Sequence, residues 1–408
     1  MSRLIFVNRF YWPDESATAQ LLTDLAESLA RQPCEICVVT SRSLLPGHLG
    51  FEQHHGVEIV RVGPGPSRGK HMLRRFCDYF SFSIAAVWRA GRMLRQDDVV
   101  IFMTDPPMLA IWLHPWLRWR KTRYFHWVQD VYPEIAATLT GHRWLNVMRP
   151  LRNLSWRRAA ACVALDRDMV EVIRSAGVPA NKIHLIPNWA PAGLTPPAPD
   201  AIRSLRHAWN LSDKFVALYS GNLGRVHDLL SIIDAAETLR DHPDIRFVFI
   251  GHGAQLSRLQ RETTARGLHN VRFFPPQPRV NLATTLGLGD VHFVTLRPGC
   301  EGFVFPSKLI GICAIGRPVV VIAPPASGLA SQVKTHGLGI SVANGDAHAI
   351  GDAILRLKSD VGLREQMGAM GRGYAHMHNL NQATATWQQL LYGQPALASD
   401  HVSRHPDN

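Results

Sequence analysis

Short hydrophobic runs alternate with longer amphipathic segments along nearly the whole chain. Such runs are typical of buried strands, and the segments between them repeat their apolar residues at helical spacing. In the first half this pattern predicts strands at 4–7, 36–40, 99–103 and 124–128 and helices at 17–31, 72–95 and 107–119. In the second half it predicts strands at 215–219, 246–250, 271–273, 291–294 and 319–322 and helices at 229–240, 254–266 and 309–315. Strands separated by such helices indicate parallel βαβ units, so we expect an α/β protein that uses one architecture twice.

A stretch rich in proline and glycine, residues 188–200, separates the two halves. Its apolar residues follow neither the strand pattern nor the helical spacing. Such composition is typical of a hinge, and a chain of 408 residues is long enough for two domains. We therefore expect domains at 1–190 and 201–380, a linker at 191–200, a helix at 381–393 that packs back on the first domain, and a tail at 394–408. Two doubly wound domains bind ligands in the cleft between the carboxyl ends of their strands.

The composition is that of a globular protein, with 46% hydrophobic and 19% charged residues, and its net charge of +12 suits an anionic partner. Most of the positive excess and nine of the eleven tryptophans lie in residues 1–190. The chain opens directly on a predicted strand, so we expect no signal peptide. It has no uninterrupted run of about 18 apolar residues, so we expect no membrane-spanning helix.

Two short patterns of metal or redox type have simpler interpretations. Cys34 and Cys37 have CxxC spacing but no second pair or histidine box nearby, and the six cysteines are scattered as in a reduced cytosolic protein. Asp166 and Asp168 have the DxD spacing that can hold a divalent ion on a diphosphate. They follow a strand-like run and open a helix, so helix capping explains them better, and we expect no metal site.

The densest group of polar chemistry occupies residues 298–318. Glu301 precedes a Pro306-Ser307-Lys308 turn at a predicted helix start, and the strand at 319–322 follows. Free N–H groups, a hydroxyl and a cation at a helix start favour an anion such as phosphate. Glu301 is placed to accept hydrogen bonds from sugar hydroxyls, although it could be only a solvated loop acid.

Two glycine turns follow strands of the second half. The first holds Gly221, Asn222, Gly224 and Arg225, where backbone N–H groups could approach an anion and Arg225 could clamp it. The second, Gly251-His252-Gly253, could line a base or ribose pocket. Ordinary βα connections also use glycine, so simple turns remain an alternative for both.

In the first half His126 and Asp130 lie where we expect a strand to open into a loop, and they are our candidates for contact with a reacting group. A core histidine and a capping aspartate are the alternative. Residues 68–95 and 112–127 mix Arg and Lys with Phe, Tyr and Trp, which suits a surface that contacts anionic lipid headgroups. Nucleic acid is not an expected partner, because no zinc finger, RNP signature or basic helix-turn-helix is present.

Four motifs together resemble glycosyltransferase family four, and most closely its bacterial members that build capsule, O-antigen or colanic-acid-type polysaccharides. They are Tyr-Ser-Gly-Asn-Leu-Gly at 219–224, Ile-Pro-Asn-Trp at 186–189, Val-Gln-Asp-Val-Tyr-Pro at 128–133, and Pro-Ser-Lys at 306–308 with Ala-Ile-Gly-Arg-Pro at 314–318. The resemblance runs in order from about residue 6 to 392. It implies a GT-B fold, two Rossmann-like domains across a cleft, retention of anomeric configuration and no obligatory metal or other cofactor.

The resemblance also implies roles for individual residues. Catalysis falls to His126, Asp130 and Glu301, and acceptor binding to Ala17 and Thr18. Donor binding falls to Gly221, Asn222, Gly224, Arg225, Gly251, Gly253, Gly302, Phe303, Pro306, Ser307 and Lys308. Many members carry a second glutamate for ribose and a lysine after the glycine turn, but Gly311 and Val226 stand there in this chain. Neutralisation of the negative charge on the donor diphosphate therefore depends more on Lys308 and Arg225.

The hypothesis from sequence is a retaining glycosyltransferase, peripheral on the inner face of a bacterial inner membrane. It would move a hexose from a UDP-linked donor to a lipid-linked saccharide acceptor in surface polysaccharide biosynthesis. The alternatives are a nucleotide-sugar 2-epimerase of the same architecture and a noncatalytic sugar-nucleotide or membrane-binding scaffold. A dehydrogenase is disfavoured because no GxGxxG follows the first strand.

Overall fold

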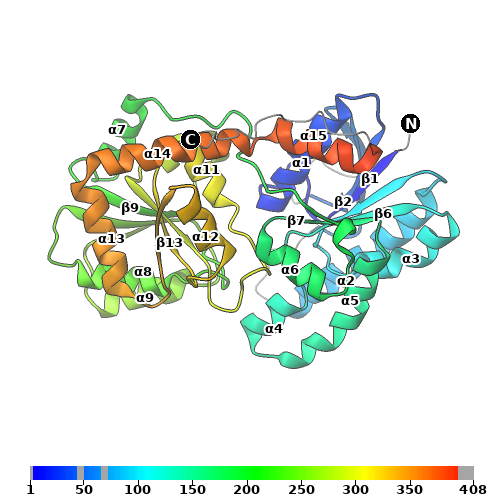
Figure 1. Ribbon diagram of the computed structural model, residues 1–408, viewed down its shortest axis with the longest axis horizontal. Coiled ribbons are helices and arrows are strands. Elements are labelled where there is room, and N and C mark those ends of the chain that lie inside the picture. Colours follow the sequence, from blue (N-terminus) through cyan, green and yellow to red (C-terminus); the bar gives the residue numbers. More distant parts are fainter. Residues whose placement is uncertain (1–2, 44–49, 66–71, 394–408) are drawn as a thin grey trace, which may run out of the picture.

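The computed structural model describes residues 3–43, 50–65 and 72–393 and contains two α/β domains side by side (Figure 1). The predicted tail at 394–408 and the start of the basic segment at 68–71 lie outside the described residues. No described helix combines the length and apolarity needed to cross a bilayer.

The N-terminal domain is built on an eight-stranded sheet of order β3-β4-β2-β1-β5-β6-β7-β8. The strands are β1 (Leu4–Val7), β2 (Ile36–Ser41), β3 (Phe51–His54), β4 (Val57–Val62), β5 (Val99–Phe102), β6 (Arg123–Trp127), β7 (Ala161–Ala164) and β8 (Ile183–Leu185). The helices are α1 (Ala17–Ala30), α2 (Met72–Met93), α3 (Leu109–Trp119), α4 (Glu134–Thr140), α5 (Arg149–Arg158) and α6 (Arg167–Ser175), with 3-10 turns η1 (Arg143–Met148) and η2 (Ala180–Lys182). All pairings are parallel except that of β3 with β4.

The C-terminal domain has a six-stranded parallel sheet of order β11-β10-β9-β12-β13-β14. The strands are β9 (Phe215–Ser220), β10 (Ile245–Ile250), β11 (Val271–Phe274), β12 (Val291–Thr295), β13 (Val319–Ile322) and β14 (Gly339–Val342). The helices are α7 (Pro199–Ala208), α8 (Leu230–Thr238), α9 (Leu256–Ala265), α10 (Leu282–Gly287), α11 (Lys308–Ala314), α12 (Gly328–Thr335), α13 (Ala347–Ser359), α14 (Val361–Met377) and α15 (Leu380–Tyr392), with the 3-10 turn η3 (Arg279–Asn281).

Both sheets reverse their strand order once, between β1 and β5 and between β9 and β12. This reversal is the topological switch point of a doubly wound sheet, where connections leave for opposite faces and open a crevice. The predicted α/β class with two Rossmann-like domains is therefore confirmed. The pattern missed the β3–β4 hairpin, because β3 is a short edge strand whose side chains are exposed or only half-buried.

The carboxyl edges of the two sheets meet. The loop after β6 pairs with the loop after β12. Asp130 forms an isolated antiparallel bridge with Val304, and the Val131 amide donates to the Phe303 carbonyl at 2.8 Å. Asp168, in the first turn of α6, accepts the Gly328 N–H at the start of α12 at 2.6 Å. Backbone and cap contacts therefore join the two domains beside the cleft.

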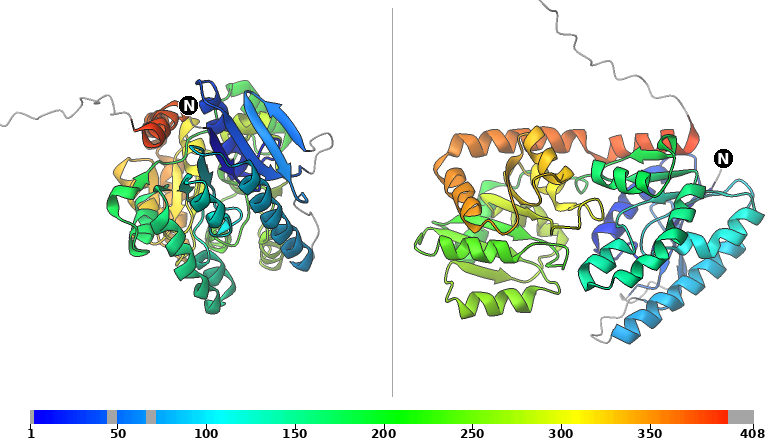
Figure 2. Two further views of the ribbon diagram at one scale, coloured as in Figure 1. Left: turned by 90° about the vertical axis from the view of Figure 1, so that its right-hand side faces the viewer. Right: turned by 60° about the horizontal axis from the view of Figure 1, so that its bottom comes forward.

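Helices α14 and α15 follow one another and span both domains, as Figures 1 and 2 show. α15 packs on α1, where the Thr384 hydroxyl donates to Ser28 at 3.0 Å. The Trp387 ring lies edge-on to Trp127 with 5.3 Å between the ring centroids. Helix α15 follows the C-terminal domain in the chain but packs into the core of the N-terminal domain.

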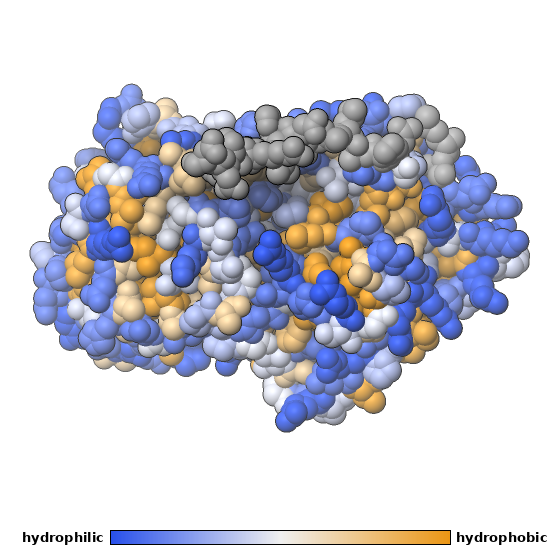
Figure 3. Space-filling model, viewed as in Figure 1, coloured by the Kyte–Doolittle hydropathy of each residue, from blue (hydrophilic) through white to orange (hydrophobic). Residues whose placement is uncertain are grey.

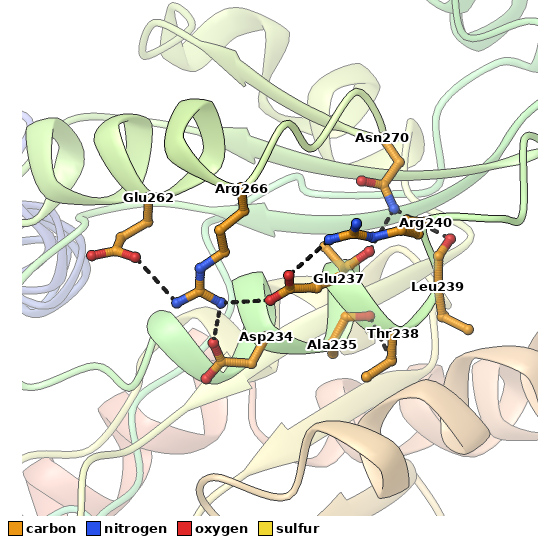
Figure 4. Close-up of polar contacts among 10 residues, drawn as sticks. Asp234, Ala235, Glu237, Thr238, Leu239, Arg240, Glu262, Arg266 and Asn270 are labelled. Carbon is orange, nitrogen blue, oxygen red and sulfur yellow. Dashed lines mark hydrogen bonds and ion pairs between the residues drawn. The ribbon is translucent and has the colours of Figure 1, made fainter.

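On the outer face of the C-terminal domain, charged side chains join α8 to α9 (Figure 4). The Arg266 guanidinium contacts the carboxylates of Asp234 at 2.6 Å and of Glu237 and Glu262 at 3.1 Å. The hydrogen bond to Asp234 leads the causes that raise the pKa of Arg266. These groups are partly exposed, so their effect is to hold two adjacent helices in register rather than to supply much stability.

Helix α11, which begins at Lys308, is held from behind by α14. A Cβ added at Gly368 would lie 2.3 Å from the Gly316 carbonyl oxygen, and one at Gly371 would lie 3.3 Å from the Cys313 Cα. The two glycines let α14 approach the end of α11 backbone to backbone.

We predict opposite effects for two alanine substitutions on α14. Gly368→Ala should destabilise the protein by about 2 kcal/mol, since a backbone clash cannot relax as a flexible side chain does. Gly373→Ala is the matched control, since a Cβ there meets nothing within 4 Å. It should stabilise the protein by about 0.5–1 kcal/mol through helix propensity. Thermal unfolding of both variants checks this, and equal shifts would contradict the packing role of Gly368.

Candidate functional site

The donor-side residues predicted from sequence converge on the switch point of the C-terminal sheet. β9 ends at Ser220 and leads into the turn that holds Gly221, Asn222 and Gly224, while β10 leads into Gly251 and Gly253. A Cβ at Gly251 would lie 2.0 Å from the Gly221 carbonyl oxygen, and one at Gly253 would lie 2.5 Å from Leu223 backbone atoms. Gly251 and Gly253 are therefore required for one turn to pack on the other, whatever further contact they make with a ligand.

The Lys308 side chain reaches across this turn. Its Nζ lies 3.6 Å from the centroid of the Tyr219 ring and 3.4 Å from the place that a Cβ on Gly221 would occupy. The amine is buried and has no hydrogen-bond partner among the described residues. Burial lowers the pKa of Lys308 to about 7. A buried amine that has no hydrogen-bond partner among the described residues and lies beside a glycine turn is arranged to receive an anion.

A histidine that the sequence analysis did not select lies in the same place. His227 Nδ1 is 2.9 Å from the Thr295 carbonyl, so this nitrogen carries the proton and Nε2 does not. Burial, followed by the Lys308 charge, lowers the pKa of His227 to about 3, so the ring stays neutral. Its position three residues after Gly224 was the available signal, but a single histidine in a helix-entry loop has no specific pattern.

The loop from β12 to α11 carries the remaining donor-side candidates. Gly302 has a φ of 69°, and a Cβ there would lie 2.8 Å from the Asp168 carbonyl, so Gly302 contacts the N-terminal domain. Phe303 accepts the Val131 amide, which brings Phe303 beside Asp130. Glu301 is half-buried in the turn, and Pro306 and Ser307 lead directly into Lys308. Arg225 is exposed, on the far end of the glycine turn from Tyr219.

His126 is buried, and it lines one small cavity together with Asp130, Thr104 and Tyr132. β6 continues to Trp127, so His126 lies within the strand, and its buried ring packs beside Phe102 and Tyr124. Its Nε2 lies 2.9 Å from the Ser155 hydroxyl of α5. Burial, followed by the Arg152 charge, lowers the pKa of His126 to about 3. The imidazole is therefore neutral, and it lies at the wall of the cavity that Asp130 also lines.

Asp130 instead lies at the meeting of the two domains, and a second carboxyl lies near it. Asp105 follows β5 at the N-terminal switch point, and the Arg9 amide donates to its carbonyl at 2.7 Å. Burial raises the pKa of Asp105 to about 6, against the opposing charge of Arg9. Burial and then the charge of Asp105 raise the pKa of Asp130 to about 7. The two carboxyls therefore titrate as a pair that holds a proton near neutral pH.

Sequence reasoning missed Asp105, together with the residues around this pair, Arg9, Tyr79 and Tyr132. The Arg9 guanidinium lies 5.5 Å from the Tyr79 ring centroid, and the charge of Asp130 contributes to a raised pKa of Tyr132. The sequence did contain a signal for Asp105, because this carboxyl lies two residues after the strand predicted at 99–103. Its significance depends on the strand order, which puts β5 beside β1.

Ala17 and Thr18 open α1, whose cap is Ser16: the Ala19 amide donates to the Ser16 hydroxyl at 3.3 Å. α1 starts after β1 at the carboxyl edge of the sheet, the edge that carries Asp105 and Asp130. The structure thus places both acceptor-side candidates along the rim of the cleft, with Ala17 exposed and Thr18 half-buried.

The residues of the two short motifs make structural contacts. Asp166 caps α6 by accepting the Met169 amide at 2.8 Å, as the capping interpretation predicted, whereas Asp168 binds Gly328 of the other domain. Cys37 is buried in β2, and burial raises the pKa of its thiol to about 12, while Cys34 lies before the strand.

Comparisons with known proteins agree with this architecture. Residues 17–189 match the model of the glycosyl transferase 4-like domain, and residues 202–374 match that of glycosyl transferases group 1. Over 181 residues the chain is 35% identical to WcaI of Escherichia coli strain K12, named for glycosyl transfer in colanic acid biosynthesis. This alignment spans 44% of each chain, so it covers less than half of the E. coli protein.

A second relative and a solved structure extend the similarity to nearly the full length. WbjE of Pseudomonas aeruginosa, named as a glycosyltransferase, is 26% identical over 280 residues, 67% of each chain. The crystal structure of Anabaena Alr3699/HepE with UDP and glucose has a TM-score of 0.73 and 16% identity, covering 97% of this chain and 100% of the other. At that identity the likeness shows the fold, which is GT-B. Two family models in the expected order, on two domains of this fold, show that the chain belongs to glycosyltransferase family four.

Proposed function

We propose that the protein transfers a hexose from a UDP-linked donor to a lipid-linked saccharide in bacterial surface polysaccharide biosynthesis, with retention of configuration. The observation that carries the proposal is the buried Lys308 amine, which has no hydrogen-bond partner among the described residues and faces Gly221 at the switch point. A diphosphate there would supply the missing counter-ion. The solved structure with UDP and glucose has the same fold, which supports UDP as the nucleotide.

The chemistry that we propose is mostly positioning and charge stabilisation. Lys308 and Arg225 would neutralise charge that develops on the leaving diphosphate, and Glu301 would accept hydrogen bonds from the transferred sugar. The departing phosphate oxygen would itself help to deprotonate the acceptor hydroxyl. In this scheme the protein's cationic groups do the work that a metal ion would otherwise do, so we propose that transfer needs no metal.

On the acceptor side we propose a role for the Asp105–Asp130 pair. The backbone of Asp130 bridges to Val304, so the Asp130 carboxyl belongs to a loop of the N-terminal domain that meets the donor loop. A carboxyl pair that shares a proton can both accept a hydrogen bond from a sugar hydroxyl and donate one.

We propose that the N-terminal domain binds the surface of an anionic membrane through α2 and α3. The long helix α2 lies at the edge of that domain (Figure 2). Trp88 on α2 is 54% exposed and Trp119 on α3 is 70% exposed. The guanidinium of Arg92 lies 3.7 Å from the Trp88 ring centroid, and that of Arg120 lies 4.3 Å from the Trp119 centroid. Exposed indole rings paired with cations suit the headgroup region.

A further set of exposed apolar side chains lies on η1 and α5: Trp144, Val147, Met148, Leu151 and Leu154. In Figure 3 hydrophobic and hydrophilic side chains are interspersed over the projection that α4 and α5 form. A surface with interspersed hydrophobic and hydrophilic side chains can contact a lipid interface without inserting deeply.

Substitution of Lys308 by methionine tests the donor site. We expect Lys308→Met to lower kcat/KM for transfer by roughly 30-fold to 1,000-fold, the effect of losing about 2–4 kcal/mol of charge stabilisation. Without nucleotide its melting temperature should be unchanged or higher, because the substitution removes a buried amine with no protein partner. UDP and UDP-sugars should raise the melting temperature of the native chain more than that of the variant.

Lys334→Met, an exposed lysine on α12, is the matched control and should change neither property. GDP and its sugars are the comparison ligands. Full transfer by Lys308→Met, or equal stabilisation of both proteins by UDP, contradicts the proposal. An epimerised sugar formed from donor alone would favour the 2-epimerase, and binding without turnover over a panel of acceptors would favour the scaffold.

The acceptor-side pair predicts a pH dependence of stability. A carboxyl whose pKa is raised by folding is protonated in the folded state while the unfolded chain is ionised, so its contribution is lost as pH rises from about 4 to about 7. Asp130→Asn should remove this loss. Relative to the native chain, the variant should gain about 2 kcal/mol of stability between pH 5 and pH 8, less than the full shift because the pair titrates together.

Melting temperatures at the two pH values measure this gain. Asp352→Asn, at an exposed carboxylate on α13, is the control and should show no such change. A variant that follows the native pH profile would show that Asp130 is ionised at neutral pH in the folded protein.

The membrane surface is tested with vesicles. Trp88→Ala combined with Trp119→Ala should reduce co-sedimentation with vesicles that contain anionic phosphatidylglycerol by about tenfold or more, because each exposed indole loses its interfacial contact. Met370→Ala, at an apolar side chain 50% exposed on α14, should bind as the native chain does. Equal binding by all three proteins would contradict the proposed surface.

A further inference from the structure

Three side chains with metal-ligating atoms meet on the outer side of the N-terminal domain. Glu27 comes from α1, His54 is the last residue of β3, and His55 lies in the tight turn to β4. The Glu27 carboxylate oxygens lie 3.3 Å from His54 Nε2 and 2.9 Å from His55 Nδ1. Within the described part of the chain these residues form the one group of three such ligands, whose atoms all lie within 4.8 Å of one another.

The turn that joins β3 to β4 brings both imidazoles to one side. Neighbouring residues of a strand point to opposite faces, but His55 has left the strand and has a φ of 48°. The His54 and His55 rings therefore stack with 4.1 Å between their centroids. On its other face His54 stacks on Trp12 at 3.7 Å, with 12° between the ring planes. Trp12 thus fixes one ligand, while His55 remains 68% exposed at the open side of the group.

Among the described residues, no lysine or arginine pairs with the Glu27 carboxylate. The described partners of Glu27 are the two imidazoles, and its own side chain is only 19% exposed. An imidazole offers a hydrogen bond but no permanent positive charge, so this half-buried carboxylate lacks a fixed cationic partner among the described residues. A dication bound by all three side chains would supply that charge.

We propose that Glu27, His54 and His55 form a binding site for one divalent transition-metal ion of the Zn²⁺ class. Two imidazole nitrogens and one carboxylate are a donor set that Zn²⁺, Co²⁺ and Ni²⁺ accept, whereas Mg²⁺ and Ca²⁺ prefer oxygen ligands. Three protein ligands leave a coordination position for water on the exposed side.

The site lies apart from the donor cleft, so its role is structural. His54 pairs with Val57, the first residue of β4, and β4 runs parallel to β2. The group is therefore at the amino edge of the parallel strands, whereas Gly221, Lys308 and Asp130 lie at carboxyl edges. A bound ion would fasten the β3–β4 hairpin, the antiparallel edge of the sheet, to α1. It would thereby also fix the helix against which α15 packs.

Metal binding by the untagged full-length chain, first stripped with a chelator, tests the site. We expect it to take up one Zn²⁺ per chain, to melt at a higher temperature with Zn²⁺, and to lose both effects on addition of chelator. Co²⁺ should give the visible absorption of a low-coordinate site with nitrogen ligands. His55→Asn and Glu27→Gln should each weaken binding at least about tenfold, since each removes one of three ligands.

His55→Asn is the decisive variant, because the His55 side chain is exposed and its removal leaves the stack of His54 on Trp12 intact. Circular dichroism should confirm that the variant is folded. His269→Asn, at an exposed imidazole of the other domain, should bind Zn²⁺ as the native chain does. Failure of the native chain to bind Zn²⁺ or Co²⁺, or equal binding by the native chain, His55→Asn and Glu27→Gln, would overturn the proposal. Donor binding and transfer are separate readouts and should be unchanged by His55→Asn.

Discussion

The backbone contact between residues 130–131 and 303–304 is the constraint on which the arrangement of the site depends. It ties the loop after β6 to the loop after β12, so the carboxyl edges of two separate sheets face each other at hydrogen-bonding distance. The same loop after β12 runs on into Lys308. The position of the donor-side cation is thereby coupled to that of the acceptor-side carboxyl.

Close backbone approach explains why so many glycines surround the donor side. Gly251 and Gly253 let the turn after β10 lie on the turn after β9, and Gly302 lets the β12 loop lie on α6. Behind α11, Gly368 does the same for α14. At each of these positions a Cβ would separate two backbones that have to touch, so the glycines shape the crevice before any ligand is considered.

Charge is distributed in opposite ways on the two sides of the crevice. On the donor side a buried amine and a neutral histidine lie beside the glycine turn after β9, and burial lowers the pKa of Lys308. On the acceptor side burial raises the pKa of Asp105, and burial followed by the charge of Asp105 raises the pKa of Asp130. Both shifts come from removing water from groups that lack a full partner in the protein. Groups in that state respond strongly to a bound ligand that supplies the missing charge or hydrogen bond.

The sequence by itself determined the strand–helix alternation, the two-domain α/β class and the family, because hydrophobic period and short motifs are local properties. It also located Gly221 and Lys308, since a glycine turn after a strand and a Pro-Ser-Lys helix start are visible in the chain. Only the tertiary structure decided that the His126 ring is buried, that Asp105 lies near Asp130, and that His227 lies near Lys308. These outcomes depend on strand order and on where β6 ends, and no local pattern encodes which strands become neighbours. The group of Glu27, His54 and His55 has the same origin, because a helix and a hairpin far apart in the sequence meet only when the sheet forms.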